Sequence, residues 1–174
     1  GIFAFGMHDR VEQKLYLVRD RLGIKPIYYL RQGEHLFFSS EIKPFEQIPG
    51  ITLTVDHAAV ADYRGGQDIV REGFYHEVVA VPPGSWVEVD LASGQLTTTP
   101  YVRLTDAIHP DRYRRMAIAS EASLVQELDV LLNAVVRDQL VSDAPIGTIC
   151  SGGVDSSLIT AIAPQNHPDL QVYN

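Results

Sequence analysis

Short apolar segments separated by polar turns dominate the first 100 residues. Four of them, at 2–7, 14–19, 27–30 and 35–40, are rich in β-branched or aromatic side chains. Strands this short, joined by turns of a few residues, favour an antiparallel sheet. Further strands are predicted at 78–81, 85–89 and 94–101. Asp56 precedes a run of small residues and is placed to cap a short helix over 57–63.

The pattern changes after residue 103. Residues 104–119 show no period, which predicts an irregular linker between two domains. A long helix should start at Ser120 or Ser123, and Ser123 with Gln126 fits a capping box. Its apolar residues repeat at helical spacing: Leu124, Leu128, Leu131, Leu132, Val135 and Val136. A buried strand over 146–150, a glycine-rich loop, a helix over 155–163 and a strand over 170–173 then give the βαβ order of an α/β fold.

Composition and charge exclude several classes of protein. With 174 residues, 45% hydrophobic and 21% charged, the chain has an ordinary globular composition. A net charge of −8 argues against binding of nucleic acid through its phosphates. No apolar run approaches the roughly 20 residues that cross a bilayer, and one cysteine cannot form an internal disulfide. We therefore expect a soluble, cytoplasmic protein without nucleic-acid or membrane partners. Gly1 and Asn174 adjoin strand-like segments, so we also expect an internal piece of a longer chain.

The sharpest chemical signal is the loop that joins the predicted strand to the next helix. It consists of Ser151-Gly152-Gly153-Val154-Asp155-Ser156-Ser157. Glycines let backbone N–H groups approach a ligand, the helix start offers unpaired donors, and the serines add hydroxyls, so the loop suits a phosphate or pyrophosphate. A carboxylate beside phosphates is most simply a Mg²⁺ ligand, which assigns Asp155 to the metal. The alternative is an ordinary capped turn between a strand and a helix.

This loop resembles the pyrophosphate loop of the N-type ATP pyrophosphatases, and the first half of the chain narrows the resemblance. Three segments are similar to signatures of class II glutamine amidotransferases, and the last of them is closest to glutamine-hydrolysing asparagine synthetases. They are 1–5, 18–29 and 38–43. Residues 81–85 with Tyr101, and 143–147 leading into the loop, also resemble that family.

The resemblance implies two domains. Residues 1–103 would be the C-terminal part of an α+β, Ntn-type αββα amidotransferase domain with antiparallel sheets, and 104–119 the linker. Residues 120–174 would be the start of an α/β parallel-sheet ATP pyrophosphatase domain. The implied reaction makes asparagine from aspartate with ammonia from glutamine, through an aspartyl-AMP intermediate, using ATP and Mg²⁺. The family also allows a homodimer. The alternatives are a relative that adenylates another carboxylate, such as a β-lactam synthetase or a peptide- or sugar-modifying enzyme, and a non-catalytic nucleotide-binding fragment.

Carried over by position, the resemblance assigns a role to each of a few residues. Pyrophosphate would be held by Ser151, Gly152, Gly153, Ser156 and Ser157, Mg²⁺ by Asp155, and adenosine by the backbone of Ile149. Ile2 and Ile24 stand where residues lining an ammonia tunnel are expected, or are plain core residues. No catalytic residue is expected in the chain, because the nucleophilic cysteine should precede Gly1. The chain alone should therefore be inactive.

Other polar residues receive structural interpretations. Arg19, Asp20, Arg21 and Lys25 are expected to organise a turn, and Glu41 and Lys43 to have a similar role. Arg112, Arg114 and Arg115 should be solvated linker residues, with phosphate binding as the alternative. The histidines at 57, 76, 109 and 167 lack the spacing of a zinc site. Cys150 is expected to be a small buried hydrophobe within its strand.

Overall fold

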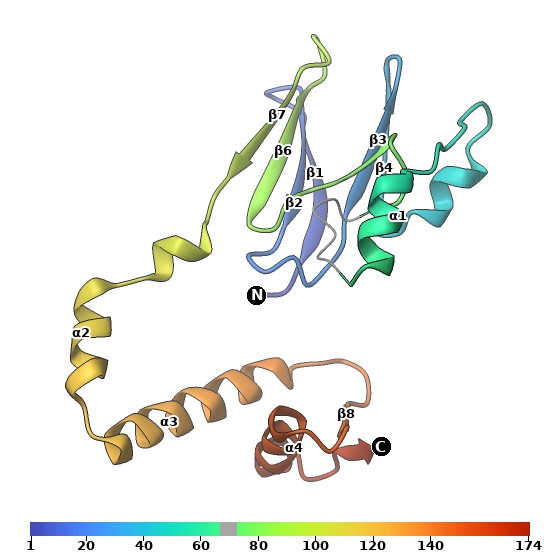
Figure 1. Ribbon diagram of the computed structural model, residues 1–174. Coiled ribbons are helices and arrows are strands. Elements are labelled where there is room, and N and C mark those ends of the chain that lie inside the picture. Colours follow the sequence, from blue (N-terminus) through green and yellow to red (C-terminus); the bar gives the residue numbers. More distant parts are fainter. Residues whose placement is uncertain (67–72) are drawn as a thin grey trace. The chain divides into compact units, whose positions relative to one another are not determined.

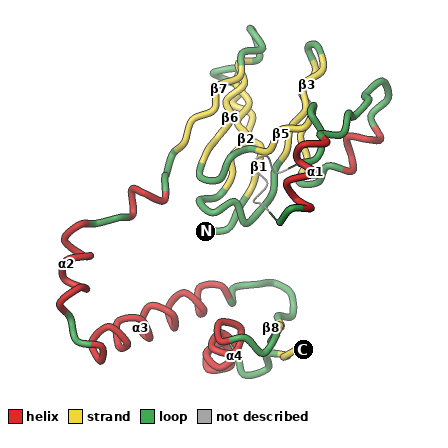
Figure 2. The backbone as a smooth tube through the Cα atoms, in the orientation of Figure 1, coloured by secondary structure: helices red, strands yellow, loops and turns green. Residues whose placement is uncertain are grey.

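The computed structural model describes residues 1–66 and 73–174 (Figures 1 and 2). The chain divides into two compact units, Gly1–Ile108 and His109–Asn174. Each unit has a hydrophobic core of its own. The domain limits expected from the sequence, 103 and 120, stay a prediction.

Two antiparallel sheets build the first unit. The larger has the strand order β1–β2–β6–β7, and the smaller has the order β4–β3–β5. The strands of the larger sheet are β1 (Ala4–Asp9), β2 (Lys14–Arg19), β6 (Ser85–Asp90) and β7 (Leu96–Pro100). Those of the smaller sheet are β3 (Tyr28–Gln32), β4 (His35–Ser39) and β5 (Val78–Ala80). The sequence predicts all seven strands, with ends that shift by up to two residues.

The core of the first unit lies between these sheets. Leu17 of β2 and Val87 of β6 are completely buried and cluster with Tyr29 of β3 and Leu36 of β4. Leu30 of β3 and Phe37 of β4, which follow Tyr29 and Leu36 in sequence, belong to a second cluster, because successive side chains of a strand point to opposite faces. The larger sheet thus covers one face of the smaller sheet, as expected for an α+β unit.

The second cluster covers the other face of the smaller sheet. It is built around Leu30, Phe45 and Val78, with Phe45 supplied by a short 3₁₀ helix, η1 (Lys43–Gln47). Helix α1 (His57–Arg64) begins at Asp56, whose Oδ1 accepts hydrogen bonds from the backbone N–H groups of Ala58 and Ala59 at 3.0 and 3.1 Å. The capped helix predicted at this position is confirmed.

The segment predicted to be an irregular linker contains helical structure. A 3₁₀ helix, η2 (Leu104–Ala107), is followed by helix α2 (Pro110–Ile118). Pro110 starts α2, where its missing N–H costs no helical hydrogen bond. Arg115 donates two hydrogen bonds to the Glu127 carboxylate at 2.8 and 2.9 Å, and Arg112 lies 3.5 Å from the same group. These arginines have a protein partner, so they are not merely solvated.

The second unit has a long helix, a short parallel sheet and a crossover helix. They are α3 (Glu121–Gln139), β8 (Gly147–Ile149), α4 (Val154–Asn166) and β9 (Gln171–Tyr173). Ser120 caps α3 by accepting a hydrogen bond from the Ser123 backbone at 3.3 Å, so the capping box predicted at Ser123 is wrong. Helix α4 contains Pro164 and ends two residues later at Asn166; the missing N–H of proline removes one helical hydrogen bond close to this end.

The parallel pairing of β8 with β9 agrees with the predicted βαβ order, but the predicted burial of β8 is wrong. Gly147 and Ile149 are exposed, and Thr148 is half-buried. In the described part of the chain β8 and β9 pair only with each other, so each strand has one unpaired edge. The core of the unit lies instead where Val136 of α3 meets Ile162 and Ala163 of α4.

No helix in the described ranges is both long and apolar enough to span a membrane.

Candidate functional site

The loop between β8 and α4 forms an open turn at the start of a helix. Gly152 has a φ of +79°, which is the left-handed region that favours glycine. A Cβ atom built on Gly152 would meet no atom within 4 Å, so the space over this part of the loop is free. Gly153 is the N-cap of α4, and no side chain caps the helix there. The first N–H groups of α4 are therefore available to an anion.

Two of the three loop serines are linked through their hydroxyls. Ser156 donates to the carbonyl oxygen of Gly153 at 3.1 Å. The hydroxyls of Ser151 and Ser156 lie 3.1 Å apart. Because the single proton of Ser156 is used on Gly153, Ser151 is the donor of this second bond. The structure thus brings together Ser151, Gly153 and Ser156, which the sequence assigned to one binding loop.

Asp155 lies in the first turn of α4 and is exposed. Among the described residues no group of three or more His, Cys, Asp or Glu side chains could hold a metal ion without other ligands. One carboxylate on a loop predicted to bind phosphate nevertheless suits Mg²⁺, which commonly takes one or two carboxylates together with phosphate oxygens and water. The residues present therefore fit Mg²⁺ bound with a nucleotide.

Ile149 ends β8 with 78% of its surface exposed, directly before the loop. Its position suits the backbone contact to adenosine expected from the sequence, because an exposed strand end leaves the main chain accessible. That contact stays a prediction.

The prediction that Cys150 is a buried hydrophobe within a strand is wrong. β8 ends at Ile149, and the half-buried Cys150 lies next to the loop, with its Sγ 3.9 Å from the Ser157 hydroxyl. The backbone N–H of Gly152 and nearby hydroxyls, with Ser157 first among them, lower the pKa of the Cys150 thiol. The sequence contained evidence for this environment. Cys150 is followed by Ser151, Gly152 and Gly153, which offer hydrogen-bond donors and no apolar side chains.

Ile2 and Ile24 come from segments that meet at Asp20. The backbone N–H of Asp20 donates to the Phe3 carbonyl at 2.9 Å, and its carboxylate accepts from the Ile24 N–H at 3.1 Å. Ile2 and Ile24 are 42% and 53% exposed, so neither is a plain core residue in this structure. Their assignment to an ammonia tunnel stays a prediction.

The interpretation of Arg19 and Asp20 as turn-organising residues is confirmed. Arg19 is buried and donates to the carbonyls of Gly23, Val81 and Lys25 at 2.7, 2.9 and 3.0 Å. Burial alone would raise the pKa of Asp20. The backbone donors, of which the Lys25 N–H at 2.9 Å is the strongest, outweigh burial and hold that pKa below its ordinary value. The two side chains therefore fix the loop between β2 and β3.

Comparison with known proteins gives two family matches along the chain. The family described as "Glutamine amidotransferase domain" matches residues 1–102, which is more than half of the chain. The family described as "Asparagine synthase" matches residues 127–174. The first match falls on the unit with the antiparallel sheets, and the second falls on the unit with the glycine-rich loop.

Curated relatives match nearly the whole chain. "Asparagine synthetase [glutamine-hydrolyzing] 3" of Bacillus subtilis (strain 168) is 34% identical over 94% of this chain and 25% of its own length. "Asparagine synthetase [glutamine-hydrolyzing] 1" of the same organism is 29% identical over 100% of this chain and 26% of its length. "Asparagine synthetase B [glutamine-hydrolyzing]" of Escherichia coli (strain K12) is 28% identical over 93% of this chain and 23% of its length.

The fold and these matches define a class of protein in which a glutamine amidotransferase unit is followed along the chain by the start of an asparagine synthase unit. The chain belongs to the glutamine-hydrolysing asparagine synthetase family. It spans about a quarter of the length of the curated relatives that it matches.

Proposed function

We propose that the protein of which this chain is part makes asparagine from aspartate, ATP and ammonia released from glutamine. The observation that carries this proposal is the open loop of Ser151–Ser157, which follows a parallel strand and starts helix α4. The relatives named as glutamine-hydrolysing asparagine synthetases support it, because their similarity extends over more than 90% of the chain and so over both of its units.

In this proposal the loop binds the part of ATP that leaves as pyrophosphate. The N–H groups at the start of α4 and the hydroxyls of Ser151, Ser156 and Ser157 donate to phosphate oxygens. Asp155 binds Mg²⁺, which when present offsets the negative charge of the leaving pyrophosphate. Transfer of AMP to the aspartate carboxylate gives aspartyl-AMP, and ammonia then displaces AMP to form the amide.

We also propose that the 174 residues alone neither hydrolyse glutamine nor make asparagine. The only cysteine is Cys150, and it lies in the second unit beside the nucleotide-type loop. The amidotransferase unit of this chain therefore has no thiol to attack glutamine. A reducing, cytoplasmic location agrees with a single free thiol, and a homodimer remains a proposal taken from the family.

The decisive experiment uses protein expressed from the complete open reading frame that encodes this chain. Pyrophosphate release is measured with Mg-ATP and aspartate, with either glutamine or ammonia as the nitrogen source, and asparagine is quantified. The variant Asp155→Asn is expected to lose at least about 100-fold in rate with both nitrogen sources, because it removes the proposed metal carboxylate. Asp62→Asn changes an exposed aspartate of helix α1 and is the matched control, with an unchanged rate expected.

Three results would contradict the proposal. Release that requires a carboxylate other than aspartate would indicate a relative that adenylates another substrate. Binding of ATP without release with any carboxylate would indicate a nucleotide-binding module without this chemistry. Equal rates for Asp155→Asn and wild type would remove Asp155 from the metal site.

A further inference from the structure

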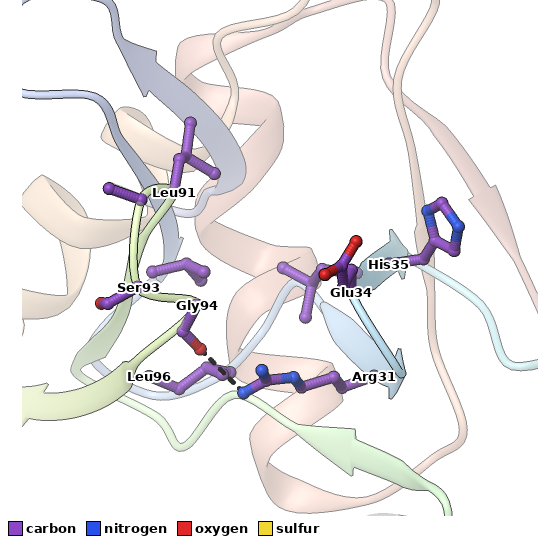
Figure 3. Close-up of a pocket in the computed structure, with 10 residues that line it drawn as sticks. Arg31, Glu34, His35, Leu91, Ser93, Gly94 and Leu96 are labelled. Atoms are coloured by element: carbon purple, nitrogen blue, oxygen red, sulfur yellow. Dashed lines mark hydrogen bonds between the residues drawn. The ribbon is translucent and has the colours of Figure 1, made fainter.

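A cavity of about 500 Å³ lies at one end of the first unit, between two hairpin tips (Figure 3). The β3–β4 hairpin contributes Arg31 and Glu34, and the turn between β6 and β7 contributes Leu91, Ser93 and Gly94. The volume is within the range of small-ligand sites, which is about 300–1,000 Å³. None of the residues assigned to nucleotide binding or to the tunnel lines it.

The guanidinium of Arg31 is held in place at this cavity. Its Nη1 donates to the Gly94 carbonyl at 2.7 Å, and its Nε donates to the Gly33 carbonyl at 3.3 Å, which bridges the two hairpin tips. These two backbone acceptors fix the plane of the guanidinium. Its third nitrogen, Nη2, makes no hydrogen bond or ion pair with any of the described residues. A positioned guanidinium with free donors suits a carboxylate.

A negative charge lies near this positive one. Glu34 also lines the cavity, and it makes no ion pair within 4.0 Å with any residue of the described ranges. In Figure 3, Arg31 and Glu34 come from the same hairpin; Arg31 extends toward the turn at Gly94, whereas His35 extends away from it. The cavity thus presents an acceptor for an ammonium group beside a donor for a carboxylate.

Aliphatic side chains also line the cavity. They are Leu36, Val89, Leu91 and Leu96. Val89 is buried in the core between the sheets, and Leu36 and Leu96 pack against that core, so this part of the cavity is rigid. An apolar group placed here gains by leaving water.

We propose that this cavity binds a free α-amino acid with an uncharged aliphatic side chain. The carboxylate of the ligand binds Arg31, its ammonium binds Glu34, and its side chain lies against the leucines. Both charges and the aliphatic lining are needed to select this class of ligand. A simple anion would be repelled by the carboxylate of Glu34, and a simple cation would be repelled by the guanidinium of Arg31.

The test is calorimetric titration of protein from the complete open reading frame, without ATP, aspartate or glutamine. The probes are L-leucine, N-acetyl-L-leucine, which lacks the ammonium, and L-leucinamide, which lacks the carboxylate. We expect saturable binding of L-leucine and at least about tenfold weaker binding of both analogues. Glu34→Gln should weaken L-leucine about tenfold without weakening the anion N-acetyl-L-leucine, whereas Arg31→Gln should weaken L-leucine without weakening the cation L-leucinamide.

Glu12→Gln and Arg114→Gln are matched controls at exposed positions outside the cavity, and neither should change the affinity. Absence of saturable heat with L-leucine, equal affinity for all three probes, or unchanged affinity in both cavity variants would overturn the proposal. The readout is binding without turnover, so its outcome is independent of whether the protein makes asparagine.

Discussion

The hydroxyl of Tyr101 donates a hydrogen bond to the backbone carbonyl of Arg19 at 2.7 Å, which joins two residues 82 positions apart. The ring of Tyr101 also stacks on Trp86, with centroids 6.1 Å apart and an angle of 10° between the planes. The end of the amidotransferase unit is thereby attached to the same loop that Arg19 and Asp20 organise.

Tyr101→Phe removes the hydroxyl and keeps the ring stacked on Trp86. We expect the free energy of unfolding to fall by about 1 kcal/mol, the usual net contribution of one hydrogen bond. Urea denaturation measures this change. Tyr113→Phe is the matched control, since Tyr113 is 75% exposed, and it should have no effect. Equal stability of Tyr101→Phe and wild type would show that the bond contributes nothing.

Gly23→Ala should destabilise the first unit more than Gly33→Ala. Both glycines have positive φ, at +67° and +59°. A Cβ atom on Gly23 would lie 2.8 Å from Cγ of Pro83, whereas one on Gly33 would meet nothing within 4 Å. We expect a loss of about 1 kcal/mol for Gly33→Ala from backbone strain alone and about 3 kcal/mol for Gly23→Ala, where overpacking adds to strain. Equal losses in urea denaturation would contradict the steric argument.

The stability contribution of Asp20 should depend on pH. The pKa of Asp20 in the folded chain lies below the ordinary 3.8, so its carboxylate stabilises the fold above about pH 3.8. This contribution is lost as the pH falls through the lower, folded-state pKa. The stability gap between wild type and Asp20→Asn should therefore be full at pH 7 and narrow below about pH 4. Urea midpoints measured from pH 7 to pH 2.5 test this, and a gap that does not change with pH would exclude it.

Cys150 should react with iodoacetamide at lower pH than an ordinary thiol, because the loop lowers its pKa. As the chain has one cysteine, the rate from mass spectrometry belongs to this residue alone. Ser157→Ala should move the midpoint of the rate–pH profile upward by removing one hydroxyl beside the sulfur. The same protein in urea provides the reference. Coincident profiles in the folded and unfolded states would rule out an effect of the loop.

Much of the fold could be predicted from local patterns. The alternation in β3 and β4 places Tyr29 and Leu36 on one face and Leu30 and Phe37 on the other, because a strand has a period of two residues. Asp56 specifies the start of α1 through two hydrogen bonds to residues two and three positions away. The loop before α4 could likewise be predicted from adjacent residues alone, because its glycines and serines follow one another in sequence.

The remaining features depend on partners distant in sequence. Residues 104–119 lack a hydrophobic period, and α2 forms there with Arg115 bound to Glu127, 12 positions away. An apolar run predicts a buried strand, yet Ile149 is exposed because the cover of β8 depends on the neighbouring elements and not on its own sequence. The cavity beside Arg31 exists because the β3–β4 hairpin meets a turn 63 residues away. Sequence by itself determined where the strands, the capped helix and the glycine-rich loop lie, because periodicity, capping and turn residues are properties of neighbouring positions. Only the tertiary structure decided which faces are covered and which charges meet, since burial and long-range contacts require the packed chain.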